Sequence, residues 1–284
     1  MSAAAEARGG ARIDRAIERL RAENRVGIMA HLVLGYPTME ASRHIAQVMV
    51  RSGVDLIEVQ LPFSDPTADG PTITLACHRA LERGVRVADG IRFVTDLTSG
   101  MAAERAAGHA VPVVFMSYFN LVFNYRNASS GGVEGFAAAA ARAGAAGIIV
   151  PDIPPEEEEE GYPAACKAHG IHPISVISPN IGEERLRAVA RVSSGFLYST
   201  SRTGTTGKDV EIGFGKLGEF LARARKICGL PLAVGFSISK REHVDALRGH
   251  AEIAVIGSHL IRVYDKHGLS GLERELRVLA GRRD

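Results

Sequence analysis

The chain has 284 residues, of which 46% are hydrophobic and 23% are charged, and its formal net charge is +2 at pH 7. These values are typical of a globular protein and lack the basic footprint expected of a nucleic-acid-binding protein. No apolar run approaches the ~20 residues of a membrane span, and residues 1–11 lack the apolar segment of a signal peptide, so we expect no membrane contact and a cytoplasmic location.

Helical and strand patterns alternate along the chain. An amphipathic helix is predicted first, over residues 12–24, because Ile13, Ile17 and Leu20 recur at helical spacing between charged residues. Eight short apolar runs then predict buried strands, which in chain order are residues 28–34, 54–60, 111–116, 147–150, 172–177, 195–199, 231–234 and 253–256. Helices are predicted between and after them, over residues 39–52, 72–84, 88–107, 133–143, 156–169, 183–192, 214–227, 240–248 and beyond 258.

This alternation predicts the fold class. Strands that alternate with helices favour a parallel sheet, and eight of them with one extra N-terminal helix favour an α/β protein built as a closed (β/α)₈ TIM barrel. The alternative is an open doubly wound sheet, but the first strand is not followed by the GxGxxG spacing of a dinucleotide-binding fold. No linker interrupts the pattern, so we expect one domain over residues 1–284, with residues 1–11 as a flexible N-terminal segment.

Five adjacent glutamates, residues 156–160, begin the helix predicted over residues 156–169. Such a run is usually a solvated face, and negative charge at a helix N-terminus also suits the helix dipole. We therefore assign these acids no chemical role.

The most informative stretch is residues 54–71, a strand that runs into a loop rich in proline and aspartate. Alternation gives the strand two faces, one formed by Val54, Leu56, Glu58 and Gln60, and the other by Ile57 and Val59. Glu58 thus points the same way as core residues at the carboxyl end of the strand, where a buried carboxylate needs a partner or a chemical role. Asp65 and Asp69 follow in the same loop, and three acids near one strand end indicate an active site.

Glycine-containing segments follow each of the last three predicted strands. Phosphate sites in (β/α)₈ barrels commonly use the loops after strands seven and eight together with a helix N-terminus, whose backbone N–H groups bind the anion. Each glycine alone is explained by a tight turn, but three such segments in these positions favour a phosphate site. Its expected residues are Gly207, Gly235, Ser237, Gly257 and Ser258.

Several of these segments resemble one family. Residues 58–71 (EVQLPFSDPTADGP) closely resemble the signature of the tryptophan synthase alpha chain family. Further loops are similar to those of the same family, and they are residues 34–37 (LGYP), 118–124 (YFNLVFN), 151–154 (PDIP) and 201–207 (SRTGTTG). The resemblance extends from about residue 14 to 275 and implies a (β/α)₈ barrel that cleaves indole-3-glycerol phosphate to indole and glyceraldehyde 3-phosphate. It also implies a partner, a beta chain that consumes the indole in an α2β2-type complex.

The resemblance assigns catalytic roles to three side chains. Retro-aldol cleavage needs a proton delivered to indole C3 and another removed from the side-chain hydroxyl, and Glu58 matches the family's catalytic glutamate, which can move both. Asp69 matches the aspartate that accepts a hydrogen bond from the indole N–H as positive charge develops there. Tyr198 matches a tyrosine near the glutamate. The resemblance implies no metal or organic cofactor. The three cysteines are too widely spaced to form a metal-binding pair, and such isolated thiols fit a reducing cytoplasm.

The same resemblance places the substrate pocket and a mobile loop. Tyr118 and Phe236 are expected to be pocket walls, although core aromatic residues would explain them equally well. Residues 200–208, with Arg202 and Thr206, match the family's sixth loop and are expected to be mobile without ligand and ordered with it. Two further acids are not expected to act in catalysis. Asp65 is expected to hold its loop by accepting backbone N–H groups, and Asp152 is expected either to cap the following helix or to contact the partner subunit.

Three positions depart from the family pattern. The family usually has glycine at positions 60 and 237, where this chain has Gln60 and Ser237, and phenylalanine at position 31, where it has His31. All three lie near the predicted pocket, so a stand-alone lyase that releases free indole is the first alternative. A sugar-phosphate aldolase or isomerase is disfavoured, because no lysine lies at a strand end to form a Schiff base. A non-catalytic subunit that regulates a partner is the alternative of another class.

Overall fold

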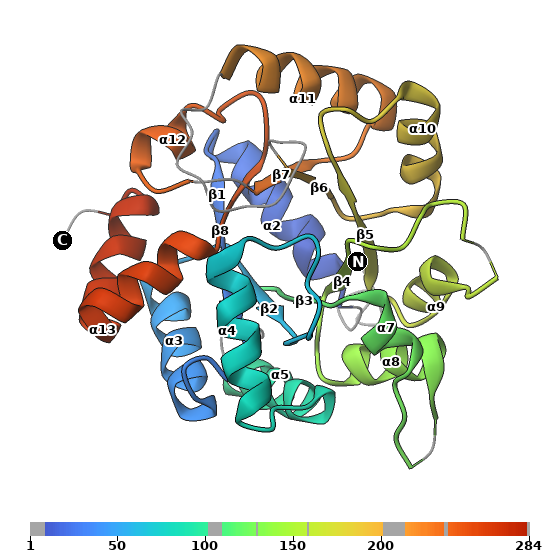
Figure 1. Cartoon of the computed structure of the whole chain (residues 1–284). Coiled ribbons are helices and arrows are strands. Elements are labelled where there is room, and N and C mark those ends of the chain that lie inside the picture. Colours follow the sequence, from blue (N-terminus) through green and yellow to red (C-terminus); the bar gives the residue numbers. More distant parts are fainter. Residues whose placement is uncertain are drawn as a thin grey trace.

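The fold is a closed barrel of eight parallel strands surrounded by helices (Figure 1). The computed structural model describes residues 9–101, 110–128, 130–157, 159–200, 214–235 and 238–282. The strands pair in chain order and β8 closes on β1; they are β1 (Gly27–Val33), β2 (Leu56–Gln60), β3 (Val113–Met116), β4 (Gly147–Val150), β5 (His172–Ile177), β6 (Leu197–Thr200), β7 (Leu232–Gly235) and β8 (Ile253–Ile256). The predicted fold class is confirmed.

The described helices are α2 (Ala11–Ala22), α3 (Met39–Ser52), α4 (Pro71–Glu82), α5 (Val87–Gly100), α7 (Phe119–Phe123), α8 (Gly132–Arg142), α9 (Tyr162–Ala168), α10 (Glu183–Val192), α11 (Phe214–Cys228), α12 (Arg241–Asp245) and α13 (Ser258–Leu279). None of them, in the part of the chain that the structure describes, is long and apolar enough to cross a membrane. Residues 1–8 of the expected N-terminal segment lie outside the described residues.

The helix predicted over residues 156–169 starts later than expected, so the predicted N-terminal end is wrong. Around the run of glutamates the described residues form turns, and α9 begins only at Tyr162. Gly161 has φ +65°, in the left-handed region, and Pro163 stands in the first helical turn, where its missing N–H costs nothing. Repulsion among the adjacent carboxylates also disfavours a helix through the run, so the helix begins only after Gly161, with Pro163 in its first turn. The short helix α7 was not predicted.

Two apolar layers explain the barrel. Inside it, Met29, Leu56 and Phe196 pack with further strand residues and with the apolar face of α2. Outside it, Ile57 and Val59 pack in a larger cluster between the strands and the surrounding helices. The predicted two faces of β2 are therefore confirmed within the strand. Val54 is an exception, because it precedes β2 and packs in the outer cluster.

Helix α2 lies across the amino end of the barrel and is tied there by polar contacts. Arg12 donates to the carbonyl of Gly144, which precedes β4, and Asp14 pairs with His172 at the start of β5, with 3.2 Å between carboxylate and imidazole. Arg21 donates to Glu252, which precedes β8, at 2.9 and 3.1 Å. The amino end is thus closed, which leaves the carboxyl end as the accessible face.

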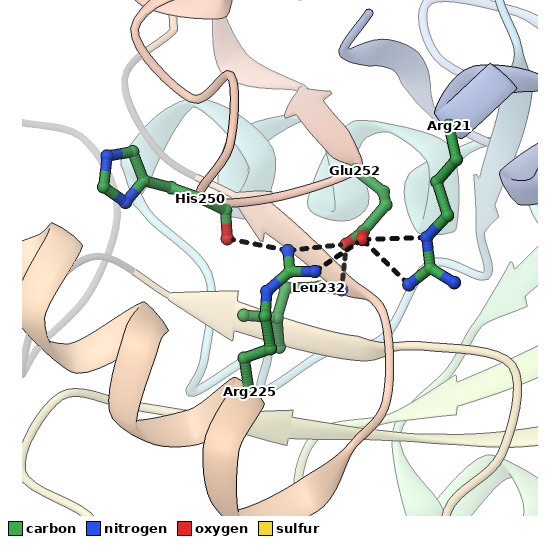
Figure 2. A network of polar contacts seen from close by, with 5 residues as sticks. All are labelled: Arg21, Arg225, Leu232, His250 and Glu252. Carbon is green, nitrogen blue, oxygen red and sulfur yellow. Dashed lines mark hydrogen bonds and ion pairs between the residues drawn. The ribbon is translucent and has the colours of Figure 1, made fainter. Parts of the chain in front are cut away.

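Glu252 is the centre of this closure. Figure 2 shows its carboxylate between the guanidinium groups of Arg21 and Arg225, and it also accepts the backbone N–H of Leu232 at 2.9 Å. Burial alone would raise the pKa of Glu252, but the backbone N–H and the two arginines outweigh burial and lower it. The ionised form is therefore the stabilising one, and one carboxylate joins β7, α2 and α11.

Glu252→Gln is expected to lower the free energy of unfolding by about 2 kcal/mol at pH 7, because two arginines lose a charged acceptor. The pKa of Glu252 is lower in the folded protein than in the unfolded chain. The stabilisation by the ionised Glu252 is therefore present above the ordinary carboxyl pKa and is lost as the pH falls through the pKa of the folded state. The difference in the free energy of unfolding between Glu252→Gln and the wild type, measured by urea unfolding, should therefore become smaller as the pH is lowered below 5.

The matched control is Glu273→Gln, which removes a carboxylate that pairs with Arg51 and Arg277 on the surface and should hardly move the unfolding midpoint. Equal midpoints for Glu252→Gln and the wild type at pH 7 would contradict the structural role of Glu252.

Candidate active site

Glu58 and His31 face each other at the carboxyl ends of neighbouring strands. The register of β1 and β2 places them directly opposite, and the Nδ1 of His31 lies 3.4 Å from the Oε2 of Glu58. Both are almost fully buried, with exposed fractions of 5% for His31 and 2% for Glu58. The sequence predicted a buried acid here, and the structure adds an imidazole as its immediate partner.

Asp69 returns from the loop after β2 to the same region. Its Oδ2 accepts hydrogen bonds from the Gln60 amide at 2.6 Å and from the Tyr118 hydroxyl at 3.0 Å. Burial, with a smaller contribution from the Glu58 carboxylate, raises the pKa of Asp69, and the bonds from Gln60 and Tyr118 and the charge of His31 oppose that rise only in part. Asp69 and Glu58 therefore share one poorly hydrated site, as their sequence positions suggested.

Tyr118 organises the loop that carries Asp69. Its hydroxyl accepts the backbone N–H of Ala68 at 2.9 Å while it donates to Asp69, and its ring stacks on Phe63 with 5.1 Å between ring centroids. Desolvation first, and then the Asp69 carboxylate, raise its pKa, so the hydroxyl stays protonated and remains a donor. Tyr118 is thus more than a core aromatic residue, because both ends of its side chain fix the acidic loop.

Gln60 makes a contact that the sequence did not predict. Its place on the same face as Glu58 predicts a position near the active site, but it does not predict the hydrogen bond to Asp69. Its Oε1 is buried and has no hydrogen-bond partner among the described residues. Glutamine therefore supplies Asp69 with a donor and leaves a free acceptor beside it.

Tyr198, on β6, completes the group. Desolvation raises its pKa well above the usual range, and the carboxylates of Glu58 and Asp69 raise it further, which places the phenol within their field. Its ring occupies the space above Gly235 at the end of β7: a Cβ added to Gly235 would lie 2.2 Å from the Tyr198 hydroxyl. Glycine at position 235 is therefore required by Tyr198, apart from any role with a ligand.

The predicted phosphate residues fall at adjacent strand ends. Gly235 pairs with Val255 in the β7–β8 ladder, and Gly257 and Ser258 begin α13 directly after β8. No side chain caps the first turn of α13. Three expected site residues, Gly207, Ser237 and Phe236, and the loop residues Arg202 and Thr206 lie outside the described residues. Their roles stay predictions.

Two further acids have structural contacts other than those expected. Asp65 accepts a hydrogen bond from the Ser64 hydroxyl at 2.5 Å, and no backbone N–H donates to its carboxylate in the described part of the chain. Asp152 accepts the backbone N–H of Phe119 at 2.8 Å, so it caps α7 instead of the helix that follows it. Sequence order could not reveal this cap, because α8 and β4 lie between α7 and Asp152 in the chain.

The arrangement is suited to proton transfer. A buried carboxylate with an imidazole partner can give and take a proton, and a second carboxylate nearby can stabilise positive charge that develops on a substrate. The described part of the chain is thus a (β/α)₈ barrel of the enzyme type, with groups suited to acid–base chemistry at the carboxyl ends of its strands.

Comparisons with known proteins specify the family. The family model described as tryptophan synthase alpha chain matches residues 17–280. The tryptophan synthase alpha chain of Syntrophotalea carbinolica is 39% identical over 267 residues, covering 94% of this chain and 99% of the relative, and that of Roseiflexus sp. is 40% identical over 255 residues, covering 90% and 92%. This chain belongs to the tryptophan synthase alpha chain family.

Solved structures agree with this assignment. A tryptophan synthase structure from Mycobacterium tuberculosis has a TM-score of 0.82 at 33% identity and covers 95% of this chain and 96% of that chain. The tryptophan synthase subunit alpha from Legionella pneumophila has a TM-score of 0.81 at 28% identity, with 95% and 97% covered. The likeness thus extends over nearly the whole barrel.

Gly235→Ala is expected to lower the free energy of unfolding by about 1–3 kcal/mol, because the new methyl group would overlap the Tyr198 ring and force it to move. Thermal unfolding measures the loss of stability, and tyrosine signals in near-ultraviolet circular dichroism report the displacement of the ring.

Gly100→Ala serves as the control, since a Cβ at Gly100 near the end of α5 meets nothing within 4 Å and alanine favours the helix. Unchanged stability and an unchanged spectrum in Gly235→Ala would show that Tyr198 does not lie over this glycine.

Proposed function

We propose that this chain cleaves indole-3-glycerol phosphate to indole and glyceraldehyde 3-phosphate, as the alpha subunit of tryptophan synthase. The observation that carries the proposal is the pair of poorly hydrated carboxylates, buried Glu58 and half-buried Asp69, near the carboxyl end of β2 in a chain of this family. The reaction needs one group that moves protons and one that stabilises charge on the indole nitrogen, and the two acids supply these functions separately.

Glu58 is the group that moves protons. It delivers a proton to C3 of the indole, which makes the ring able to accept the electrons of the breaking carbon–carbon bond. It then takes the proton of the side-chain hydroxyl as the aldehyde forms, and it is reprotonated in the process. One carboxyl group can serve both steps because indole C3, which receives the first proton, is bonded to the carbon whose hydroxyl gives up the second, so both positions lie within the reach of one side chain.

Asp69 binds the indole nitrogen. Its Oδ2 is already occupied by Gln60 and Tyr118, which leaves Oδ1 without a partner among the described residues. The indole N–H donates to this oxygen, and the bond strengthens as C3 is protonated and the ring becomes cationic. Gln60 and Tyr118 hold the carboxylate in the orientation that presents Oδ1.

The phosphate group is bound at the ends of β7 and β8. Backbone N–H groups near Gly235, Gly257 and Ser258 supply donors, and the N-terminus of α13, whose first helical segment continues to the kink at Gly268, adds a favourable field. Gly207 and Ser237 belong to the same proposed site. Phosphate anchored there places the indole end of the substrate against Glu58 and Asp69, with His31, Tyr118 and Phe236 as walls of the indole pocket.

A beta chain is the proposed partner, in an α2β2-type complex. Helix α7 presents Phe123, an apolar side chain with 42% of its surface exposed, and Asp152 fixes the start of this helix next to the active-site end of the barrel. We assign this exposed aromatic residue to the surface that contacts the beta chain. A cytoplasmic location and a single domain over residues 1–284 are part of the same proposal.

Free indole release is the second candidate, because two departures from the family pattern touch the catalytic carboxylates directly: His31 contacts Glu58 and Gln60 contacts Asp69. Measurement of indole release by the purified chain alone and with a beta chain separates the two functions. Strong activation by the beta chain indicates a synthase subunit, and high unaided turnover indicates a stand-alone lyase.

Glu58→Gln is expected to lower kcat for cleavage by about 10²–10⁴-fold, because the amide cannot transfer a proton. Substrate binding should persist, since the phosphate and indole contacts are made elsewhere. Indole release gives kcat, and isothermal titration with the substrate gives the affinity of the inactive variant.

Glu134→Gln is the matched control, because Glu134 lies on α8 at the surface, where it contacts His169. Wild-type kcat in Glu58→Gln would exclude the acid–base role of Glu58. Unchanged cellular function of this variant would instead favour a non-catalytic regulatory subunit.

A further inference from the structure

The pairing of His31 with Glu58 distinguishes this site, because the family resemblance leads one to expect phenylalanine at position 31. A phenyl ring would leave the buried carboxylate without a polar partner on β1. Here the imidazole Nδ1 lies 3.4 Å from Oε2, and the strand register holds both residues at the same level of the barrel. The pairing of β1 with β2 therefore fixes the positions from which the two side chains meet.

One polar atom of this pair has no partner, and a second has only the imidazole beside it. The Nε2 of His31 is buried without a hydrogen-bond partner among the described residues, and the buried Oε2 of Glu58 has the His31 Nδ1 at 3.4 Å but no hydrogen bond of normal geometry. Unpartnered buried polar atoms are costly and tend to mark a site that completes itself with a ligand or a proton. The pair thus has the capacity for one more interaction than the folded chain supplies.

The groups around His31 favour a positive charge on it. Glu58 on β2 and Asp69 in the loop after β2 both act on the imidazole. Gly257 after β8 lies close to the ring, because a Cβ added there would be 3.4 Å from the His31 Cδ2, and Tyr36 and Tyr264 line a small cavity next to it. Burial opposes the imidazolium, but the Glu58 carboxylate and then Asp69 outweigh burial and raise the pKa of His31 above its ordinary value of 6.5.

We propose that His31 is a positioning and proton-holding residue for Glu58, so that the proton used in catalysis is shared between His31 Nδ1 and Glu58 Oε2 before turnover. This inference extends the proposed lyase function and depends on it. The proton moves from His31 to Glu58 and from Glu58 to indole C3. When Glu58 takes the hydroxyl proton during bond cleavage, it passes that proton back to His31. One proton is used and one is returned, and no redox partner is needed.

The first test is the pH profile of kcat in His31→Phe and His31→Gln. A lone carboxyl ordinarily loses its proton at lower pH than an imidazole does, so both variants should lose activity at a lower pH than the wild type. We expect the alkaline limb to move down by about one unit, which corresponds to about a tenfold loss of kcat on that limb, with KM little changed. Glutamine can still donate to Glu58, so a purely orienting histidine would be rescued by His31→Gln, and a proton-holding one would not.

The second test does not depend on cleavage. In ¹⁵N-histidine-labelled protein, the signal of His31 is assigned by its absence in His31→Phe, and its titration is compared between wild type and Glu58→Gln. Removal of the carboxylate should lower the pKa of His31 by about one unit or more. His169 is the internal control, because its partner is Glu134 on α8, and its titration should not change.

An unchanged titration of His31 in Glu58→Gln, or wild-type pH profiles in both His31 variants, would overturn the proposal. A wild-type chain that releases no indole would refute the lyase function instead. In that case the titration still decides whether His31 and Glu58 share a proton.

Discussion

Removal of the Glu58 carboxylate from water is the constraint on which the site depends. Barrel closure places this side chain 2% exposed at the end of β2, so every neighbour that touches it must offset the lost hydration. The chain supplies an imidazole from the adjacent strand, and the phenol of Tyr198 faces the same region. This compensation is incomplete, because the Oε2 of Glu58 makes no hydrogen bond of normal geometry within the described part of the chain.

The two ends of the barrel treat buried carboxylates in opposite ways. At the amino end, Glu252 is surrounded by arginines and a backbone N–H, which lower its pKa and make it a structural anion. At the carboxyl end, Asp69 has only neutral donors and a histidine, and burial raises its pKa. Stability is thus concentrated at one end of the barrel, where α2 closes it, and reactivity at the other.

Much of the barrel could be predicted from the sequence because it depends on local periodicity. The runs at residues 147–150, 172–177 and 253–256 match their strands residue for residue. The first and third are fully buried apolar segments, and residues 172–177 are partly buried. The start of α9 was misjudged because Gly161 and Pro163 outweighed the helical pattern of the acids. Val54 was misjudged because alternation holds only inside the strand, and β2 begins two residues later.

The site could be predicted in its residues but not in its contacts. Alternation placed Glu58 on the inner face, and the motif supplied Asp69 and Tyr198. The partners of these side chains come from other elements: His31 from β1, Tyr118 from the loop after β3, and Gly235 from β7. Such pairings depend on strand register and barrel closure, which a single sequence pattern does not encode. The cap on α7 by Asp152 escaped prediction for the same reason.

A crystal structure of Glu58→Gln with indole-3-glycerol phosphate bound would show whether one phosphate-anchored indole lies between Glu58 and Asp69. We expect phosphate oxygens on the backbone N–H groups near Gly235 and Gly257, the indole N–H on Asp69 Oδ1, and C3 within reach of the side chain at position 58. Phosphate bound away from the ends of β7 and β8, or an indole ring out of reach of both positions, would refute this binding mode.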